Sequence, residues 1–139
     1  MAKLRVAAAN ARTATVFHVA NEFDPDYRTL VSTGPKTESG YPVRREVTVP
    51  IHHLHPLLDV LSARTTYFPP GDAWTCIFEP RHVLRVGSGE AVTVVICVHC
   101  GDVEFIVEGS SIGTRSVVPA ANGQLETLLR SLIGPIDAT

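Results

Sequence analysis

Two β-rich segments separated by only four residues constrain the fold more than any other feature of the sequence. The segments are WTCIFEPRHVLRV (74–86) and AVTVVICVHC (91–100), and GSGE (87–90) joins them. A loop of that length containing glycine usually connects two antiparallel strands. Pro80 has no backbone N–H for a ladder hydrogen bond, so we expect a bulge or an edge position there. The centre of the chain is therefore predicted to be a β-hairpin.

Further strands are predicted on both sides of this hairpin. Before it, residues 13–21, 27–34 and 43–51 are β-rich, and the polar Gly/Pro stretch 33–42 is typical of an exposed loop. After it, DVEFIVEG (102–109) is expected to extend the second strand or to start a third, and TRSVVP (114–119) to add another.

Two amphipathic helices complete the predicted fold. The first is expected from about His55 to Arg64, because four leucines near it recur with helical spacing. These are Leu54, Leu57, Leu58 and Leu61. The second follows Asn122 as N-cap and stops at Gly134–Pro135. Strands, a helix, more strands and a helix favour an α+β fold, an antiparallel sheet with two helices packed on one face.

Size and composition indicate one globular domain over residues 1–139. The chain is 45% hydrophobic and 19% charged, which is ordinary for a protein with a packed core. The net charge of −2 gives no basic footprint for nucleic acid. The first residues lack the apolar region of a signal peptide, and the longest apolar run, Ala91 to Val98, is far below the ~20 residues of a membrane span. We therefore expect a cytoplasmic protein that binds neither nucleic acid nor membrane.

The three cysteines and one histidine of the hairpin form the main candidate site. An odd number of cysteines in a reducing compartment argues against a disulfide framework and favours a metal site or simple burial. A hairpin closed symmetrically by GSGE would place His82 opposite Val95 and diagonal to Cys97, with about 7–8 Å between their backbones. The same register would place Cys100 opposite the residue next to Cys76.

This geometry predicts a structural zinc site made of Cys76, His82, Cys97 and Cys100. A bulge at Pro80 would shift the register by one residue and bring Cys76 opposite Cys100. Three thiolates and one imidazole are an accepted zinc ligand set. The alternative that all three cysteines are small core residues stays open at this stage.

A redox function is the third interpretation of the cysteines. Cys97-Val-His-Cys100 resembles the Cys-x-His-Cys motif of disulfide oxidoreductases, in which a thiolate lies at a helix N-terminus. Here Gly101 and the β-rich segment 102–109 follow the motif, so the helix dipole that would lower the thiol pKa is not expected.

Three other patterns contain chemically active side chains. The cluster His52, His53 and His55 precedes the first predicted helix and is expected to be a solvated surface group, although His52 and His55 have the spacing of a metal pair and a catalytic role for one histidine stays open. GSSIG (109–113) fits Gly-x-Ser-x-Gly around Ser111, but a helix is not predicted after it, so a turn is favoured over a nucleophile elbow. Arg81 and Arg85 share one side of a regular strand and would form a solvated face or an anion clamp.

The string CIFEPRHVLRV followed by VVICVHC resembles a pattern in small uncharacterised bacterial proteins. The resemblance covers about residues 74–104, and the group has no established activity. It implies a shared hairpin, and it implies that Cys76, His82, Cys97 and Cys100 form one site.

The function predicted from these observations is a small protein-binding or regulatory module, stabilised by a structural zinc in the central hairpin. Its expected partner is another protein. Two alternatives remain: a small metal- or histidine-dependent enzyme that uses the Cys/His cluster, and a thiol redox protein.

Overall fold

The computed structural model describes residues 2–34, 36–69, 76–87 and 91–134. Seven antiparallel strands form one sheet in the order β2-β3-β1-β4-β5-β6-β7. The strands are β1 (Thr13–Val19), β2 (Thr37–Glu38), β3 (Tyr41–Pro50), β4 (His82–Val86), β5 (Val92–Cys97), β6 (Asp102–Val107) and β7 (Ser110–Ser116). The α-helices are α1 (Ala2–Ala9), α2 (Tyr27–Thr33), α3 (His55–Ser62) and α4 (Pro119–Ile133), and the short 3-10 helices are η1 (Ile51–Leu54) and η2 (Arg64–Thr66).

The two faces of the sheet pack against different groups of side chains. The main core joins residues of α1, α3 and α4 to one face of β1, β4, β5 and β6; examples are Leu4, Leu57, Leu125, Val16, Leu84 and Ile96. The second cluster consists of Phe17, Val19, Val43, Val83 and Val95, with Tyr41, Phe78 and Ile106 against it. Strand β5 therefore has buried side chains on both faces, which explains why its sequence is apolar except at Thr93.

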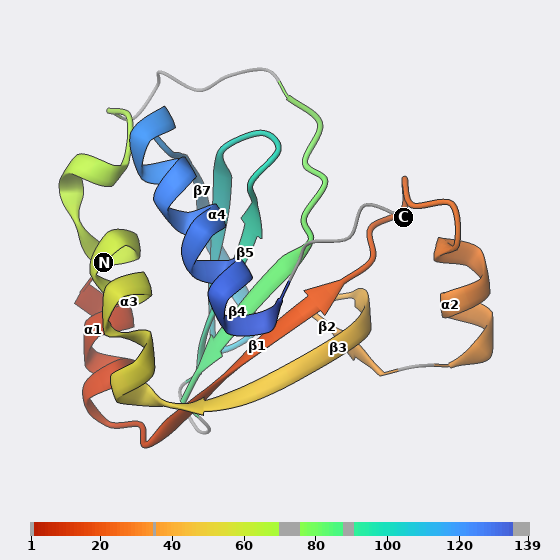
Figure 1. Cartoon of the computed structure of the whole chain (residues 1–139), viewed down its shortest axis with the longest axis horizontal. Helices are drawn as coiled ribbons and strands as arrows, with labels where there is room; N and C mark the ends of the chain where they lie inside the picture. The colour runs from red at the N-terminus through yellow and green to blue at the C-terminus, as the bar shows by residue number, and fades with distance from the viewer. Residues whose placement is uncertain (1, 35, 70–75, 88–90, 135–139) are drawn as a thin grey trace.

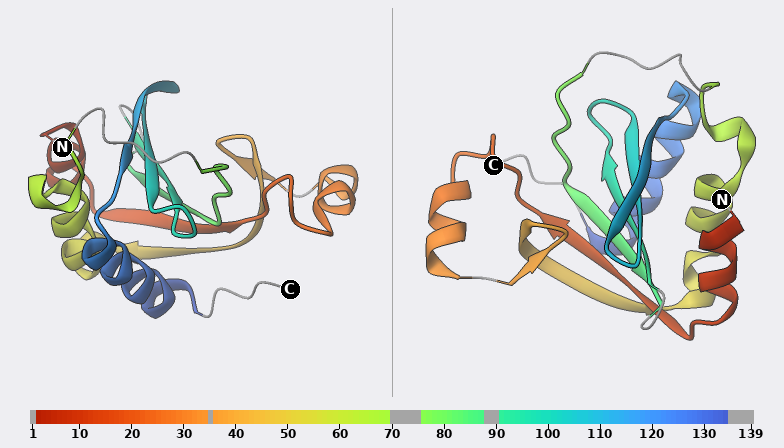
Figure 2. Two further views of the ribbon diagram at one scale, coloured as in Figure 1. Left: turned by 90° about the horizontal axis from the view of Figure 1, so that it is seen from above. Right: turned by 180° about the vertical axis from the view of Figure 1, so that it is seen from behind.

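The helices are distributed unequally around the sheet. Helices α1 and α3 lie at one end of the molecule and α2 lies at the other, while α4 runs beside α3 (Figure 1; Figure 2). The apolar stripe of α4 buries Ala121, Leu125, Leu129 and Ile133. No helix in the described ranges is long and apolar enough to cross a membrane.

The predicted antiparallel α+β fold is confirmed, but the helices differ from the prediction. Residues 27–34 were expected to be a strand, whereas Tyr27–Thr33 form α2. This helix has no buried residue, so the pattern of apolar residues carries no helical period. Helix α1 was not predicted from the sequence, although its Leu4 is fully buried in the main core.

The boundaries of two other elements also need correction. Helix α4 begins with Pro119 at its first turn, not after Asn122. The side chain of Asn122 instead donates a hydrogen bond to the carbonyl oxygen of Val98 at 2.8 Å. The first strand of the central hairpin begins at His82, and residues 76–81 run in irregular conformation before it.

Candidate functional site

The structure joins two of the predicted site residues in a disulfide. Cys76 and Cys100 are bonded to each other, with their Cα atoms 5.9 Å apart. The bond connects the irregular segment 76–81 to the β5–β6 turn (98–101). The expectation that the cysteines would avoid disulfide pairing is therefore wrong for this pair. The close approach of Cys76 to Cys100 was one of the two registers considered for the hairpin.

The third cysteine lies beside this disulfide and remains a thiol. Cys97 is the last residue of β5 and is fully buried. Its sulfur accepts hydrogen bonds from the backbone N–H groups of Glu79 and Cys100, each at 3.4 Å. Burial raises the pKa of the Cys97 thiol, and the two N–H donors oppose part of that rise. Cys97 is therefore protonated near neutral pH.

His82 belongs to a different side of the sheet. It pairs with Ile96 of β5, one residue away from the predicted partner Val95. Ile96 faces the main core, and neighbouring residues of a strand point to opposite faces. His82 therefore shares a face with Ile96, whereas Cys97 points to the other face.

The predicted zinc ligands are thus only partly brought together. Cys76, Cys97 and Cys100 are neighbours, and His82 is directed away from them. Within the part of the chain that the structure describes, no group of three or more His, Cys, Asp or Glu side chains is arranged to hold a metal ion. Zinc binding by the four predicted residues stays a prediction.

His82 stacks on a second buried histidine, His18, which sequence reasoning missed. The two residues pair directly across β1 and β4, and their ring centroids are 5.7 Å apart with 23° between the planes. Both side chains are buried, with exposed fractions of 1% for His82 and 5% for His18. Both ring nitrogens of His82 are buried without a hydrogen-bond partner among the described residues.

Burial and neighbouring charge keep this histidine pair neutral. Burial lowers the pKa of His82 to about 3, and His18, Arg81 and Arg45 contribute in the same direction. Burial also lowers the pKa of His18, helped by nearby arginines and opposed by Asp24. A neutral imidazole can donate one hydrogen bond and accept another. Its unprotonated nitrogen can also bind a metal ion without first losing a proton.

The buried carboxylate of Asp24 connects several chain segments near this histidine pair. Asp24 forms an ion pair with Arg81 at 3.0 Å and accepts hydrogen bonds from Arg44 at 3.3 Å and from the Asn21 backbone N–H at 3.0 Å. The Asn21 side chain also donates to the Pro80 carbonyl oxygen at 3.3 Å. The irregular segment is therefore held at residues 80–81 by the loop after β1, and at residue 76 by the disulfide.

A small cavity adjoins His82 on the face that bears the main core. It has a volume of about 320 Å³, and its lining includes His82, Arg81, Glu79, Asn122 and Arg130. Arg81 is neutralised by Asp24, and Arg130 by Glu126 at 2.9 Å. The charges of the described lining residues balance, and Glu79 and Arg81 form part of the cavity wall.

The other sequence candidates lie elsewhere. His52 and His53 are exposed on η1, with ring centroids 4.4 Å apart, and His55 is exposed at the start of α3. Ser111 is exposed within strand β7, so the expected turn is a strand instead and the strand–turn–helix of a nucleophile elbow is not formed there. Arg85 forms an ion pair with Glu38 at 3.5 Å, so its guanidinium is not paired with Arg81 as the predicted anion clamp requires.

Asp24 and His18 could not be identified from motifs in the sequence. They meet Arg81 and His82 because β1 lies between β3 and β4, a pairing of strands that are not consecutive in the chain. The chain matches no protein-family model, no curated protein and no solved structure.

Proposed function

We propose that this chain is a small protein-binding regulatory module whose irregular segment 76–81 responds to thiol oxidation. The observation that supports the proposal is the Cys76–Cys100 disulfide, which fastens this segment to the β5–β6 turn with a third thiol, Cys97, beside it. The proposal keeps the regulatory module predicted from the sequence. It replaces the stabilising zinc by a covalent bond that a reductant can open.

The two states of the module differ in how many points hold the segment. In the oxidised state the segment is held by the disulfide, by the Glu79 N–H on the Cys97 sulfur and by the contacts of residues 80–81 with Asn21 and Asp24. A dithiol reductant transfers two electrons and two protons, and the disulfide becomes the thiols of Cys76 and Cys100 while the reductant becomes a disulfide. Residues 76–78 then lose their covalent anchor, whereas residues 80–81 keep their contacts.

Ile77 gives the segment a means of recognising a partner protein. Its side chain is 63% exposed, and it follows Cys76 directly. An exposed aliphatic side chain next to a reversible covalent bond changes its position when that bond opens. We infer that partner affinity depends on whether residues 76–78 are fixed against the turn.

The raised pKa of Cys97 limits exchange of this thiol with the disulfide near neutral pH. Its thiolate could attack the sulfur of Cys100, forming a Cys97–Cys100 bond and releasing Cys76 as a thiolate. Only the thiolate attacks, and burial raises the pKa of Cys97. The exchange is therefore slow at neutral pH and accelerates as the pH rises toward the pKa of Cys97.

In the reduced state, zinc binding is the alternative to three free thiols. Reduction would leave three neighbouring thiols, and the fourth ligand would have to come from a side chain other than the inward-directed His82 or from water. Disulfides are transient in a reducing cytoplasm. If the chain acts there, as its sequence predicts, the reduced form is the resting form and either proton or zinc occupies its sulfurs.

Hydrogen exchange of the oxidised and reduced protein tests the proposal. We expect one reactive thiol per unfolded chain before reduction and three after it, since the chain has three cysteines and one disulfide. We expect faster amide exchange at residues 76–79 after reduction, with little change in β1 and β4. The Cys76→Ser variant should show the fast exchange under both conditions, and Cys97→Ser should retain the wild-type response.

Three results would decide against the redox module. Three reactive thiols in every glutathione buffer would mean that the disulfide does not form. Unchanged exchange on reduction would mean that the bond does not control the segment. One zinc per reduced chain, with three thiols protected until a chelator is added, would support the structural zinc instead.

A further inference from the structure

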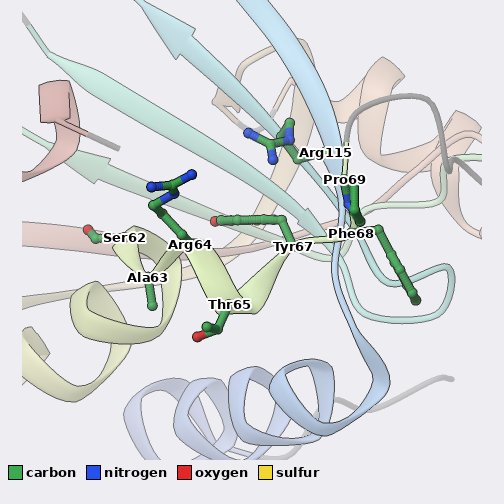
Figure 3. Close-up of a pocket in the computed structure, with 8 residues that line it drawn as sticks. All are labelled: Ser62, Ala63, Arg64, Thr65, Tyr67, Phe68, Pro69 and Arg115. Carbon is green, nitrogen blue, oxygen red and sulfur yellow. The ribbon is translucent and has the colours of Figure 1, made fainter.

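A second pocket, which contains none of the cysteines among its described lining residues, is lined by two arginines. It lies between η2 and β7, has a volume of about 520 Å³ and is bounded by Arg64, Tyr67, Phe68, Pro69 and Arg115 among others. Figure 3 shows the guanidinium groups of Arg64 and Arg115 on the same side of Tyr67, one from η2 and the other from β7. None of the described residues that line this pocket is acidic.

Neither of the two arginines has a carboxylate partner in the described part of the chain, in contrast to four other arginines. Arg44, Arg81, Arg85 and Arg130 each form an ion pair. Across the described ranges, by contrast, neither Arg64 nor Arg115 has an acidic side chain within ion-pair distance. Two like charges in one pocket repel each other, and an anion between them removes that repulsion.

The wall behind the arginines is fixed by the fold. The Tyr67 hydroxyl donates to the Leu61 carbonyl oxygen, and its ring packs edge-on against the buried Phe105 with centroids 6.2 Å apart. The Arg115 guanidinium lies 5.0 Å from the centroid of the Tyr67 ring. This cation–π contact orients Arg115, so its N–H groups need little reordering when a ligand binds.

Backbone hydrogen bonds join the two chain segments that carry the arginines. The Phe68 N–H donates to the Ser116 carbonyl oxygen at 3.0 Å, and the Val118 N–H donates to the Thr66 carbonyl oxygen at 2.8 Å. Arg64 and Arg115 lie on these two segments. The backbone frame of the pocket is therefore preorganised.

We propose that this pocket binds a small organic oxyanion, a carboxylate or a phosphate monoester, between Arg64 and Arg115. Guanidinium groups bind both kinds of anion through paired N–H donors. The apolar body of the ligand lies against Ala63, Phe68 and Pro69, which form part of the lining. The volume exceeds the need of inorganic phosphate and falls within the range of ordinary ligand pockets, about 300–1,000 Å³.

Titration of the full chain with matched aromatic probes tests this site. Phenyl phosphate, benzoate and the neutral analogue benzamide would be titrated separately and followed by backbone amide NMR shifts and by calorimetry. We expect both anions to shift residues 63–68 and 114–116, phenyl phosphate to bind more tightly because of its second charge, and benzamide not to bind. The ratio of the two anion affinities distinguishes a phosphate site from a carboxylate site.

Substitutions separate this site from general attraction to a basic surface. Arg64→Gln and Arg115→Gln should each weaken phenyl phosphate binding by about tenfold, the loss expected for one charge-assisted hydrogen-bond pair. Arg28→Gln, on the exposed face of α2, is the matched control and should leave the affinity unchanged. Arg115→Lys keeps the charge and serves if Arg115→Gln is too unstable to study.

Several results would overturn the proposal. Benzamide binding as tightly as benzoate would mean that the arginines do not select the ligand. Equal affinity of wild type and Arg64→Gln, or anion-induced shifts confined to residues far from η2 and β7, would place binding elsewhere.

Discussion

The sulfur cluster and the histidine pair lie one residue out of register on the paired strands β4 and β5, yet their environments are opposite. Cys97 follows Ile96, the residue across from His82, and points to the other face of the sheet. The sulfur side has backbone N–H donors and a disulfide that is partly exposed. The histidine side is buried, and the nitrogens of His82 have no partner in the described structure. An offset of one residue between two paired strands thus places the sulfurs and the histidines on opposite faces of the sheet.

Removing the disulfide should produce the largest effect. The bond closes a loop with a sequence separation of 24 residues, so Cys76→Ser should lower the free energy of unfolding by about 3 kcal/mol under oxidising conditions. Urea unfolding of the wild type and the variant measures the difference.

Reduction provides the control for this prediction. In excess reductant the wild type should fall to the stability of Cys76→Ser, because both chains then lack the cross-link. Cys100→Ser should match Cys76→Ser under both conditions. A stability difference that persists after reduction would show that Cys76 acts through packing and not through the disulfide.

The buried histidines should make the free energy of unfolding depend on pH. The pKa of His82 is about 3 in the folded chain and near 6.5 when unfolded. Between these values the unfolded chain binds a proton that the folded chain does not, so stability falls as the pH decreases and levels off below the folded pKa. From pH 6.5 to pH 5 this should cost about 2 kcal/mol. Urea unfolding at a series of pH values measures the slope.

Two substitutions assign that slope to its residue. His82→Leu should flatten it and change stability at pH 7 by less than about 1.5 kcal/mol, since the ring nitrogens make no hydrogen bond within the described structure. His53→Gln, at an exposed position, should leave the slope unchanged. An unchanged slope in His82→Leu would mean that other groups control the acid sensitivity.

Local patterns in the sequence predicted those parts of the fold that depend on local structure. The spacing of Leu125 and Leu129 gave the buried stripe of α4, and Gly134 is its C-cap as expected. The antiparallel pairing of β4 with β5 was also predicted correctly. Each of these features depends on a periodic pattern or on a short connection.

The parts that failed depend on contacts between distant segments. The register of β4 and β5 differs by one residue from the symmetric hairpin, and part of the connecting loop lies outside the described residues. Composition cannot determine this one-residue offset. The offset nevertheless decides that the side chains of His82 and Cys97 point to opposite faces of the sheet. The contact of His18 with His82 requires the pairing of β1 with β4, and no local sequence pattern predicts that pairing.

The turn that carries Cys100 should be sensitive to its glycine. Gly101 has a φ of +72°, and a Cβ there would lie 3.4 Å from the Val117 carbonyl oxygen. Gly101→Ala should therefore cost about 1–2 kcal/mol through backbone strain. The control is Gly123→Ala within α4, where a Cβ meets no neighbour and should stabilise by about 0.4–1 kcal/mol. Thermal unfolding of both variants measures the contrast, and equal stability of Gly101→Ala and wild type would contradict the strain.

The smallest effect tests the separation of the two sides directly. Cys97→Ser should cost about 1 kcal/mol, the loss expected for a buried thiol, whereas a zinc ligand would cost several kcal/mol. In a double-mutant cycle with His82→Leu, the coupling energy should stay below about 0.5 kcal/mol, because the two side chains share no partner. A larger coupling would mean that Cys97 and His82 act on one common group. That result would restore the single Cys/His site predicted from the sequence, since a metal ion shared by both residues is the simplest link across the sheet.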